Sequence, residues 1–386
     1  MSGVLIHDGR RPGQLKWSLE ALSAGVADGA ILTPFATPRT KEPRYPSASE
    51  VAKSIGQAGG EVIFDPMTHA AVMAQSDRFD FYDGWGLWGS SDKSLQTPAA
   101  RLSHVERVFK AQDQVGAPRL APTLAINAPL SAEATYALEI ANVARSLESS
   151  AWQSLAGTRA FWSSGSRLDA HIGVLASLRA PVWVVTVVNE SVGDNVPDMA
   201  DTEAFEGLCR SIHSLSIRSR VIIAQSDYSG LPAVAAGADT VGSGWDRGQR
   251  TFDPLSFRQS DGSPRRSASY VTQGGLLSVL RRDAADVITQ WDSSRAFAMR
   301  GGPMPPSDQI ERIHHFRQLR GLIQAINSGT TRQGRVDELR RAYTQAAQDY
   351  DDLVRALRPT VTAQQKLMWI ENPRSALEAY SLREGL

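Results

Sequence analysis

Apolar positions in the first 250 residues alternate between short runs rich in β-branched residues and longer stretches with helical spacing. This alternation predicts βα units around a parallel sheet. Leu15, Leu19 and Leu22, for example, are spaced to share one face of a helix. Eight strands are predicted, at residues 4–7, 30–34, 61–65, 119–126, 156–162, 182–188, 220–224 and 239–242.

The number and order of these units predict an α/β fold, a (β/α)8 TIM barrel over residues 1–257 with a C-terminal helical extension. An open doubly wound sheet is the alternative. A dinucleotide-binding version of that sheet carries Gly-x-Gly-x-x-Gly after its first strand, where this chain has Asp8, Gly9 and Arg10.

Beyond the barrel, residues 258–300 are predicted to be a helical segment packed on it, with one or two helices over 270–291. Residues 301–386 are predicted to form a helical hairpin and tail, in which Ser307 caps a helix that ends near residue 327. The next helix has a heptad seam that packs within the chain or, less favoured, in a dimer. The seam consists of Val336, Leu339, Tyr343, Ala346, Tyr350, Leu353 and Leu357.

The amino-acid composition limits the classes of binding partner and site that the chain can have. The 386 residues carry 41 basic and 41 acidic side chains, so bulk charge gives no support to nucleic-acid binding. One cysteine, Cys209, rules out an intrachain disulfide or a Cys-rich zinc site and indicates a reducing compartment, so a cytoplasmic location is predicted. No apolar run reaches the roughly 18 to 20 residues of a membrane span, and no signal peptide is recognisable. No membrane partner, metal or cofactor is predicted.

Candidate catalytic residues follow from the barrel, because reactive groups gather at the carboxyl ends of its strands. Five carboxylates follow five different predicted strands, and two of them are expected to form an acid–base or nucleophile pair for a glycosidic or N-glycosidic bond. The first choices are Glu190 and Asp227, which follow well-defined late strands. The five are Asp8, Asp65, Glu190, Asp227 and Asp246.

Polar and aromatic residues at the same strand ends are candidates for holding the substrate, predicted to be a small molecule or nucleoside-like. Residues 79–88 are rich in aromatic rings that suit a sugar or nucleobase, or alternatively plug the barrel mouth. The candidates are His7, Arg10, Arg39, His69, Phe81, Tyr82, Trp85, Trp88, Asn127, Trp162, Asn189, Gln225, Tyr228, Trp245, Arg247 and Arg250.

Residues 236–250, Ala-Gly-Ala-Asp-Thr-Val-Gly-Ser-Gly-Trp-Asp-Arg-Gly-Gln-Arg, resemble the last-strand region of tRNA-guanine transglycosylase-like barrels. The resemblance implies a (β/α)8 barrel that exchanges a base through an aspartate, with Asp227 or Asp65 as the acidic residue. The usual zinc site of that family needs several cysteines, and this chain has only Cys209. The resemblance therefore favours a zinc-free barrel that acts on a base or glycoside.

Two other functions remain open at this stage. A phosphorylated metabolite or FMN is expected to bind open amides at residues 242–244, with Arg247 and Arg250 nearby. Alternatively, the barrel is a non-catalytic module that forms a homo-oligomer or binds a protein through helices over residues 307–358.

Overall fold

The computed structural model describes residues 3–70, 80–89, 95–189, 192–193, 196–254 and 269–386. Its main sheet has eight parallel strands in the order β3-β2-β1-β10-β9-β6-β5-β4, so each strand lies beside its predecessor in the barrel and β10 closes onto β1. The strands are β1 (Gly3–His7), β2 (Gly29–Leu32), β3 (Glu61–Phe64), β4 (Ala125–Ile126), β5 (Gln153–Thr158), β6 (Val182–Val188), β9 (Arg220–Ala224) and β10 (Thr240–Gly244). The (β/α)8 barrel is confirmed.

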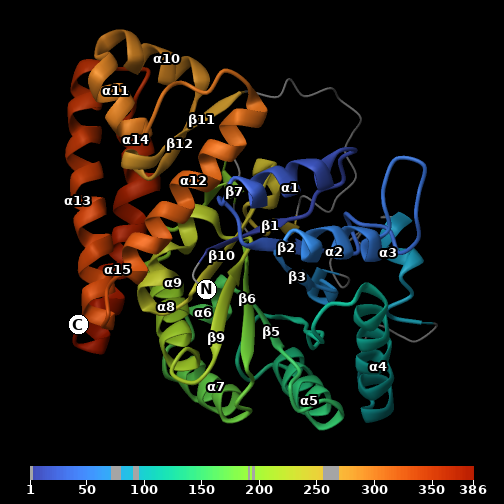
Figure 1. The fold of residues 1–386 in the computed structure, drawn as a ribbon. Coiled ribbons are helices and arrows are strands. Elements are labelled where there is room, and N and C mark those ends of the chain that lie inside the picture. Colours follow the sequence, from blue (N-terminus) through green and yellow to red (C-terminus); the bar gives the residue numbers. More distant parts are fainter. Residues whose placement is uncertain (1–2, 71–79, 90–94, 190–191, 194–195, 255–268) are drawn as a thin grey trace.

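Helices cover the outside of this sheet (Figure 1). Their ends follow local chemistry: Ser47 and Glu50 form a capping box that starts α2, and Thr97 caps α4 with Pro98 at its first position. The helices up to β10 are α1 (Gln14–Ser23), α2 (Ala48–Gln57), α3 (Asp80–Gly84), α4 (Pro98–Val115), α5 (Ala132–Leu147), α6 (Arg159–Trp162), α7 (Ser166–Ser177), α8 (Thr202–Leu215) and α9 (Leu231–Ala236). Short pieces complete this part: η1 (Thr68–Ala70), β7 (Val192–Gly193), β8 (Val196–Pro197), η3 (Asp227–Gly230) and η4 (Arg247–Gln249).

Two strand predictions differ in extent from the structure. Of residues 119–126, only the last two belong to the regular ladder, apart from an isolated bridge between Leu120 and Trp152. Pro122 explains the interruption because it has no backbone N–H to donate. The predicted strand at 156–162 lies earlier, at β5, because Thr158 accepts a hydrogen bond from the Phe161 amide and starts α6.

The prediction of helix over 270–291 is wrong in its first half. Residues 270–281 form a hairpin of β11 (Tyr270–Gln273) and β12 (Ser278–Arg281), joined by η6 (Gly274–Leu276). Gly274 and Gly275 interrupt the helical pattern, and the flanking β-branched residues favour strands. Helix α10 (Arg282–Trp291) then follows, with α11 (Ser293–Arg300) after it.

The C-terminal helices form a column along one side of the barrel, beside α8 and α9 (Figure 1). They are α12 (Asp308–Asn327), α13 (Arg332–Ala356), α14 (Ala363–Lys366) and α15 (Asn372–Glu384), with the π-turn η7 (Leu367–Glu371) before the last. Ser307 caps α12 as predicted. Helix α12 packs against β1, α1 and α9, which is the place of an eighth barrel helix.

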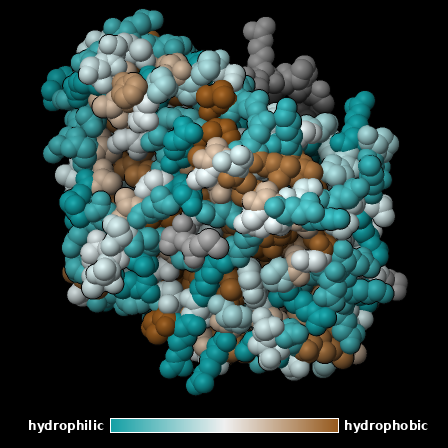
Figure 2. All heavy atoms as spheres, in the orientation of Figure 1, coloured by the Kyte–Doolittle hydropathy of each residue, from teal (hydrophilic) through white to brown (hydrophobic). Residues whose placement is uncertain are grey.

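The heptad seam of α13 is buried inside the chain, from Val336 to Leu353, and its last member Leu357 is partly buried. The seam packs on α9, α12 and η6, so packing within the chain is confirmed for these residues. Whether residues 307–358 also bind a partner stays a prediction, as does the division at residues 257 and 300. Figure 2 shows that hydrophilic side chains make up most of the visible face, with the largest apolar group near its middle. In the described part of the chain, no helix is both long and apolar enough for a membrane span.

Between β3 and β4, side chains hold the barrel wall together. Between β3 and β4, the buried Gln112 amide on α4 donates to the carbonyls of Phe64 (3.1 Å) and Leu120 (2.9 Å). It also accepts from the Leu120 N–H at 3.0 Å. The Thr68 hydroxyl bonds the backbone of Thr123 in the same way. These side chains replace the backbone ladder that would otherwise satisfy the strand edges.

Gln112→Leu is expected to lower the free energy of unfolding by about 2 to 4 kcal/mol, because three buried backbone groups lose their partner. Urea denaturation measures this. Gln57→Leu, on the exposed end of α2, is the matched control and should change stability by no more than about 0.5 kcal/mol. Equal effects of the two substitutions would contradict the role of Gln112 in joining β3 to β4.

Candidate active site

The barrel interior is layered. Its middle is one apolar cluster that includes Leu5, Ile31 and Ile63. Below it, Arg220 at the start of β9 reaches Glu61 at the start of β3 with two hydrogen bonds of 2.6 and 2.8 Å. Side chains alternate along a strand, so the residues two positions beyond the apolar layer, His7, Thr33 and Asp65, lie at the carboxyl end, in the barrel mouth.

His7 is a neutral hydrogen-bond donor. Its Nε2 accepts the Gln225 backbone N–H at 2.9 Å, so the ring hydrogen must be on Nδ1. Nδ1 is buried and has no partner in the described part of the chain. Burial lowers the pKa of His7 to about 3, so the ring stays uncharged at neutral pH. Gly242 makes room for it, since a Cβ there would come within 2.5 Å of Nε2.

Asp65 and Asp8 are the two carboxyl groups whose ionisation the barrel disfavours. Asp65 is 4% exposed, and burial raises its pKa to about 6 although its Oδ1 accepts the Met67 N–H at 2.8 Å. Asp8 is half-buried, and desolvation raises its pKa to about 6 against the opposing hydrogen bonds from the Thr37 hydroxyl and the Gly9 backbone. Such values suit proton transfer near neutral pH.

Other buried polar atoms at the mouth are also left without partners among the described residues. They are His69 Nε2 and Asn189 Oδ1, each on a side chain about 2% exposed. Both residues adjoin Phe252: the His69 ring lies 4.9 Å from its ring, and Asn189 donates to its carbonyl. Since buried polar groups are nearly always hydrogen-bonded, these atoms are candidate contacts for a ligand, a water or residues outside the described ranges.

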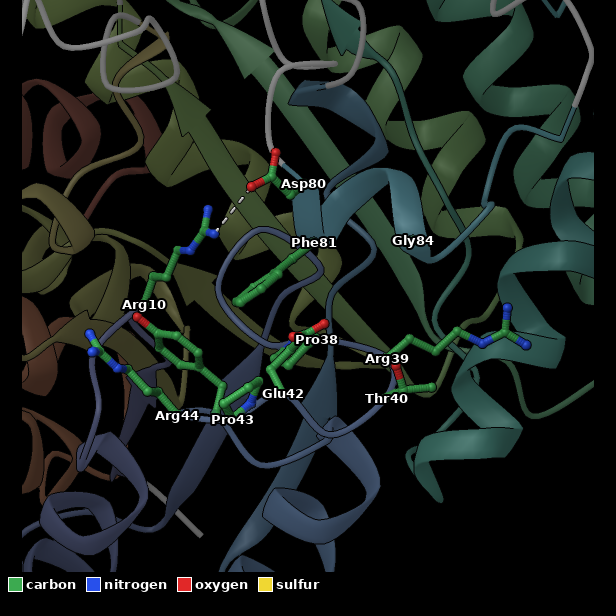
Figure 3. A pocket seen from close by; sticks show the side chains of 11 residues that line it. Arg10, Pro38, Arg39, Thr40, Glu42, Pro43, Arg44, Asp80, Phe81 and Gly84 are labelled. Atoms are coloured by element: carbon green, nitrogen blue, oxygen red, sulfur yellow. Dashed lines mark ion pairs between the residues drawn. The ribbon is translucent and has the colours of Figure 1, made fainter.

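A pocket of about 660 Å3 opens on the rim, two residues beyond Asp8 at Arg10 (Figure 3). The loops after β1, β2 and β3 line it, with Arg10, Pro38–Thr40, Glu42–Tyr45 and Phe81 among the lining residues. The Tyr45 and Phe81 rings meet edge to face at 5.3 Å. The Arg10 guanidinium lies over Phe81, 4.1 Å from the ring centre. The pocket therefore combines aromatic faces with a fixed cation.

The remaining predicted aromatic residues pack within the protein. Tyr82 stacks on Phe35 and accepts a hydrogen bond from Trp88, and Trp88 stacks on His104. Trp85 Nε1 donates to the Thr37 carbonyl at 3.0 Å. Trp162 and Trp245 are about 1% exposed, and their indole N–H groups donate to the Gly157 carbonyl and the Ser18 hydroxyl. Of the predicted ring-binding residues at 79–88, only Phe81 lines the described rim pocket.

Asp227 lies in a buried polar network. His315 Nε2 donates to its Oδ1 at 2.9 Å, the Ser243 hydroxyl lies at 3.2 Å and the Arg250 guanidinium at 4.0 Å. Burial alone would raise the pKa of Asp227, but these partners outweigh it and lower the pKa. The residue also adopts a left-handed backbone with φ 51°. Asp227 is thus held ionised, and its carboxylate is bound by His315, Ser243 and Arg250.

The network extends into the C-terminal region. His315 Nδ1 lies 2.8 Å from the Thr272 hydroxyl, which reaches Glu311 Oε1 at 2.8 Å. Tyr228 packs edge to face on His315, and burial raises its pKa well above the usual value. Its hydroxyl has no partner among the described residues. This network fastens α12 and β11 to the ends of β9 and β10.

Asp246 caps η4 and pairs with Arg11 at 2.6 Å and Arg312 at 3.4 Å. Arg247 stacks on Tyr270 at 3.6 Å, and Arg250 donates to the Gly244 carbonyl at 3.0 Å. Residues 242–244 belong to β10 and pair with β1 instead of forming an open loop. The described residues therefore give no support to the expected phosphate or FMN site there.

The other predicted residues are dispersed. Arg39 lies on the pocket rim but donates to Gln114 at 3.1 Å, and Asn127 is exposed. Gln225 is half-buried with φ 44° and bonds His7 through its backbone. Glu190 lies outside the described residues. No group of three or more His, Cys, Asp and Glu side chains able to hold a metal occurs within the ranges described above.

Sequence reasoning missed three contributors: His315 and Glu311 on α12, and Thr272 on β11. The first two are four residues apart and therefore share a helix face. Both are buried, 0% and 5% exposed, although they are polar. A glutamate and a histidine on the apolar side of an amphipathic helix were the signal that could have found them.

Asp65→Asn is expected to stabilise the protein at pH 7.5 by an amount on the order of 2 kcal/mol. The pKa of Asp65 in the folded protein, about 6, exceeds its ordinary value of 3.8. The contribution of Asp65 to the free energy of unfolding of the wild type is therefore fully present below pH 4 and is lost as the pH rises through 6. The gain should therefore disappear at pH 4. Thermal denaturation at both pH values measures it, and a gain that is equal at both would contradict an ionising Asp65.

Asp227→Asn is expected to destabilise the fold by about 3 to 5 kcal/mol, because Arg250 loses a buried counter-charge and His315 loses a charged hydrogen-bond acceptor. Asp246→Asn is the matched control, since its ion pairs are half-exposed and worth about 0 to 1 kcal/mol. Urea denaturation of both variants gives the comparison. The structural assignment of Asp227 fails if its substitution leaves stability unchanged.

Comparisons with known proteins give only distant similarities. No protein-family model and no curated sequence matches the chain. Among solved structures, an L-ribulose 3-epimerase is similar at 12% identity and TM-score 0.39, with 86% of this chain and 99% of that chain covered. A probable tagatose 6-phosphate kinase from Sinorhizobium meliloti gives 10% identity and TM-score 0.32, covering 100% and 98%. A psychrophilic family 10 xylanase gives 11% and 0.32, covering 68% and 94%. Their TM-scores lie below 0.5, so these similarities transfer no activity and no family to this chain, and none of the three proteins is a tRNA-guanine transglycosylase. The barrel itself rests on the strand order described above.

Proposed function

We propose that the protein is an enzyme acting at a glycosidic or N-glycosidic bond, with Asp8 and Asp65 as its acid–base pair. One observation carries this proposal: the carboxyl groups that follow β1 and β3 each have their pKa raised to about 6, and the loops after the same strands line a pocket with aromatic walls. Cleavage of such a bond needs one carboxylic acid and one carboxylate. The other described candidates, Asp227 and Asp246, are occupied by cations.

The surroundings of Asp8 and Asp65 indicate which of them is the base and which is the acid. Asp8 accepts hydrogen bonds from Thr37 and Gly9, which favour its carboxylate, so it serves as the base. Asp65 is more deeply buried and accepts one hydrogen bond, so it serves as the acid. Asp65 gives its proton to the departing oxygen or nitrogen as the bond to the anomeric carbon breaks. Asp8 takes a proton from the water or acceptor that attacks that carbon.

Strand order supports a particular stereochemistry. β2 lies between β1 and β3, and neighbouring strands are about 4.8 Å apart, so the backbones that carry the two carboxyl groups are roughly 10 Å apart. We therefore propose the wider arrangement of the two carboxyl groups, in which a water fits between substrate and base and the configuration inverts. His7 Nδ1–H is the donor available for a substrate hydroxyl in the same mouth.

The test is a panel of nucleosides and nitrophenyl glycosides with the wild type, Asp8→Asn and Asp65→Asn. Each substitution is expected to lower kcat/KM by at least about 100-fold, since general acid–base catalysis contributes that much. The wild-type rate should peak near pH 6, where one group is protonated and the other ionised. Asp246→Asn is the control that keeps activity. NMR of the first product anomer checks for inversion.

Three outcomes would count against this function: no turnover across the panel, full activity in both Asp variants, or a flavin retained by the purified protein. The first would favour a non-catalytic binding module. The last would favour the FMN alternative.

A further inference from the structure

Arg10 is held in a fixed position at the rim pocket. Its guanidinium lies flat over Phe81 at 4.1 Å, and one terminal nitrogen lies 3.6 Å from the Asp80 carboxylate. The Asp80 side chain is 86% exposed and that of Arg10 is 40% exposed, so this ion pair is loose and open to solvent. The other nitrogens of Arg10 bond no residue in the described ranges. A guanidinium stacked in this way presents its donors with little loss of rotamer freedom.

A second arginine, Arg44, lies on the same side of the pocket. Arg44 comes from the loop after β2, lines the pocket and forms no hydrogen bond or ion pair within the described part of the chain. Figure 3 shows Arg10 and Arg44 on one side of Phe81 and Arg39 on the opposite side, with the guanidinium groups of Arg44 and Arg39 both pointing away from Phe81. Arg39 donates to Gln114. The lining thus contains two guanidinium groups that are open to an anion and one that Gln114 occupies.

The carboxylates of the lining do not cancel this preference. Asp80 lies 3.6 Å from one nitrogen of Arg10, and the lining has three arginines against the two carboxylates of Asp80 and Glu42. An oxyanion with two or three oxygens matches the planar fork of an arginine better than one exposed carboxylate 3.6 Å away. Aromatic rings beside the cation would accommodate a sugar or base attached to that anion.

We propose that this pocket binds an anionic group, a phosphate or a carboxylate, on a sugar- or nucleoside-like ligand, through Arg10 and Arg44. The inference rests on the proposed function for the identity of the attached ring. It makes the substrate a charged glycoside and places its anion over the first three strands, beside Asp8. This place is distinct from the ends of β9 and β10, where a barrel phosphate was expected.

The experiment measures binding by calorimetry with the intact chain, using ribose 5-phosphate, glucuronate, ribose and inorganic phosphate as probes. Ribose 5-phosphate or glucuronate is expected to bind at least about tenfold more tightly than ribose, and the better of the two identifies the anion. Arg10→Gln and Arg44→Gln should each remove about tenfold of that affinity. Arg39→Gln is the matched control and should leave it unchanged.

Asp80→Asn gives a test in the opposite direction. Removing the competing carboxylate should tighten binding of the anionic probe about two- to threefold, because Arg10 loses the negative charge 3.6 Å from its guanidinium. Thermal melts confirm that every variant is folded. Sodium chloride at 0.5 M should weaken binding in the wild type and much less in Arg10→Gln.

Equal affinity for ribose and ribose 5-phosphate together with no preference for glucuronate would overturn the inference, as would an equal loss in Arg39→Gln and Arg10→Gln. These results are separate from the proposed function, which turns on catalysis by Asp8 and Asp65. If the anion binds as expected while both Asp variants stay active, the function fails and the binding site remains. If the variants lose activity but anions are not preferred, only the inference fails.

Discussion

The contact between Asp227 and His315 joins two parts of the chain that are 88 residues apart. Helix α12 packs on β1, α1 and α9, so it covers the barrel wall on that side. Burying these polar groups is costly unless every partner is present, and here Arg250, Ser243, Thr272 and Glu311 supply them. Since β11 and α13 pack on α12, the C-terminal column depends on this contact.

The same barrel contains carboxylates in opposite environments. Asp227 and Asp246 end strands, as Asp8 and Asp65 do, yet the first two face cations from distant parts of the chain and the last two do not. A carboxylate with a buried cation beside it is a poor proton donor, because its ionised form is stabilised. The position at a strand end is therefore necessary for a role in catalysis in this fold but does not decide it.

The sequence predicts features that depend on local pattern. Strands 182–188 and 220–224 coincide with β6 and β9, because strands buried on both faces need continuous apolar runs. The Ser307 cap and the α13 seam follow from equally local rules. The hairpin at 270–281 was missed because short apolar runs fit either period, and Gln112 because its role exists only once β3 and β4 are in place.

Strand-end reasoning named His7, Asp8 and Asp65 as candidates but could not rank them above Asp227. Ranking needs the pKa, and the pKa depends on partners such as His315 that come from a helix almost ninety residues later. The exposed or packed state of the aromatic residues at 79–88 is likewise a tertiary property. Phe81 lines the pocket, while Tyr82 one position later stacks in the core, because successive side chains point in different directions.

Two groups of strands in the barrel thus differ in what their carboxyl ends hold. Strands β9 and β10 hold the C-terminal region, whereas β1, β2 and β3 carry the neutral donor, the two raised carboxyl groups and the pocket. Thr37 connects the last two features: its hydroxyl holds Asp8, its carbonyl accepts from Trp85, and the next residue, Pro38, lines the pocket. A ligand that shifts this loop must also alter the hydrogen bond to Asp8. Occupancy of the pocket and the ionisation of the proposed base are therefore physically linked, since the loss of a donated hydrogen bond raises the pKa of a carboxyl group.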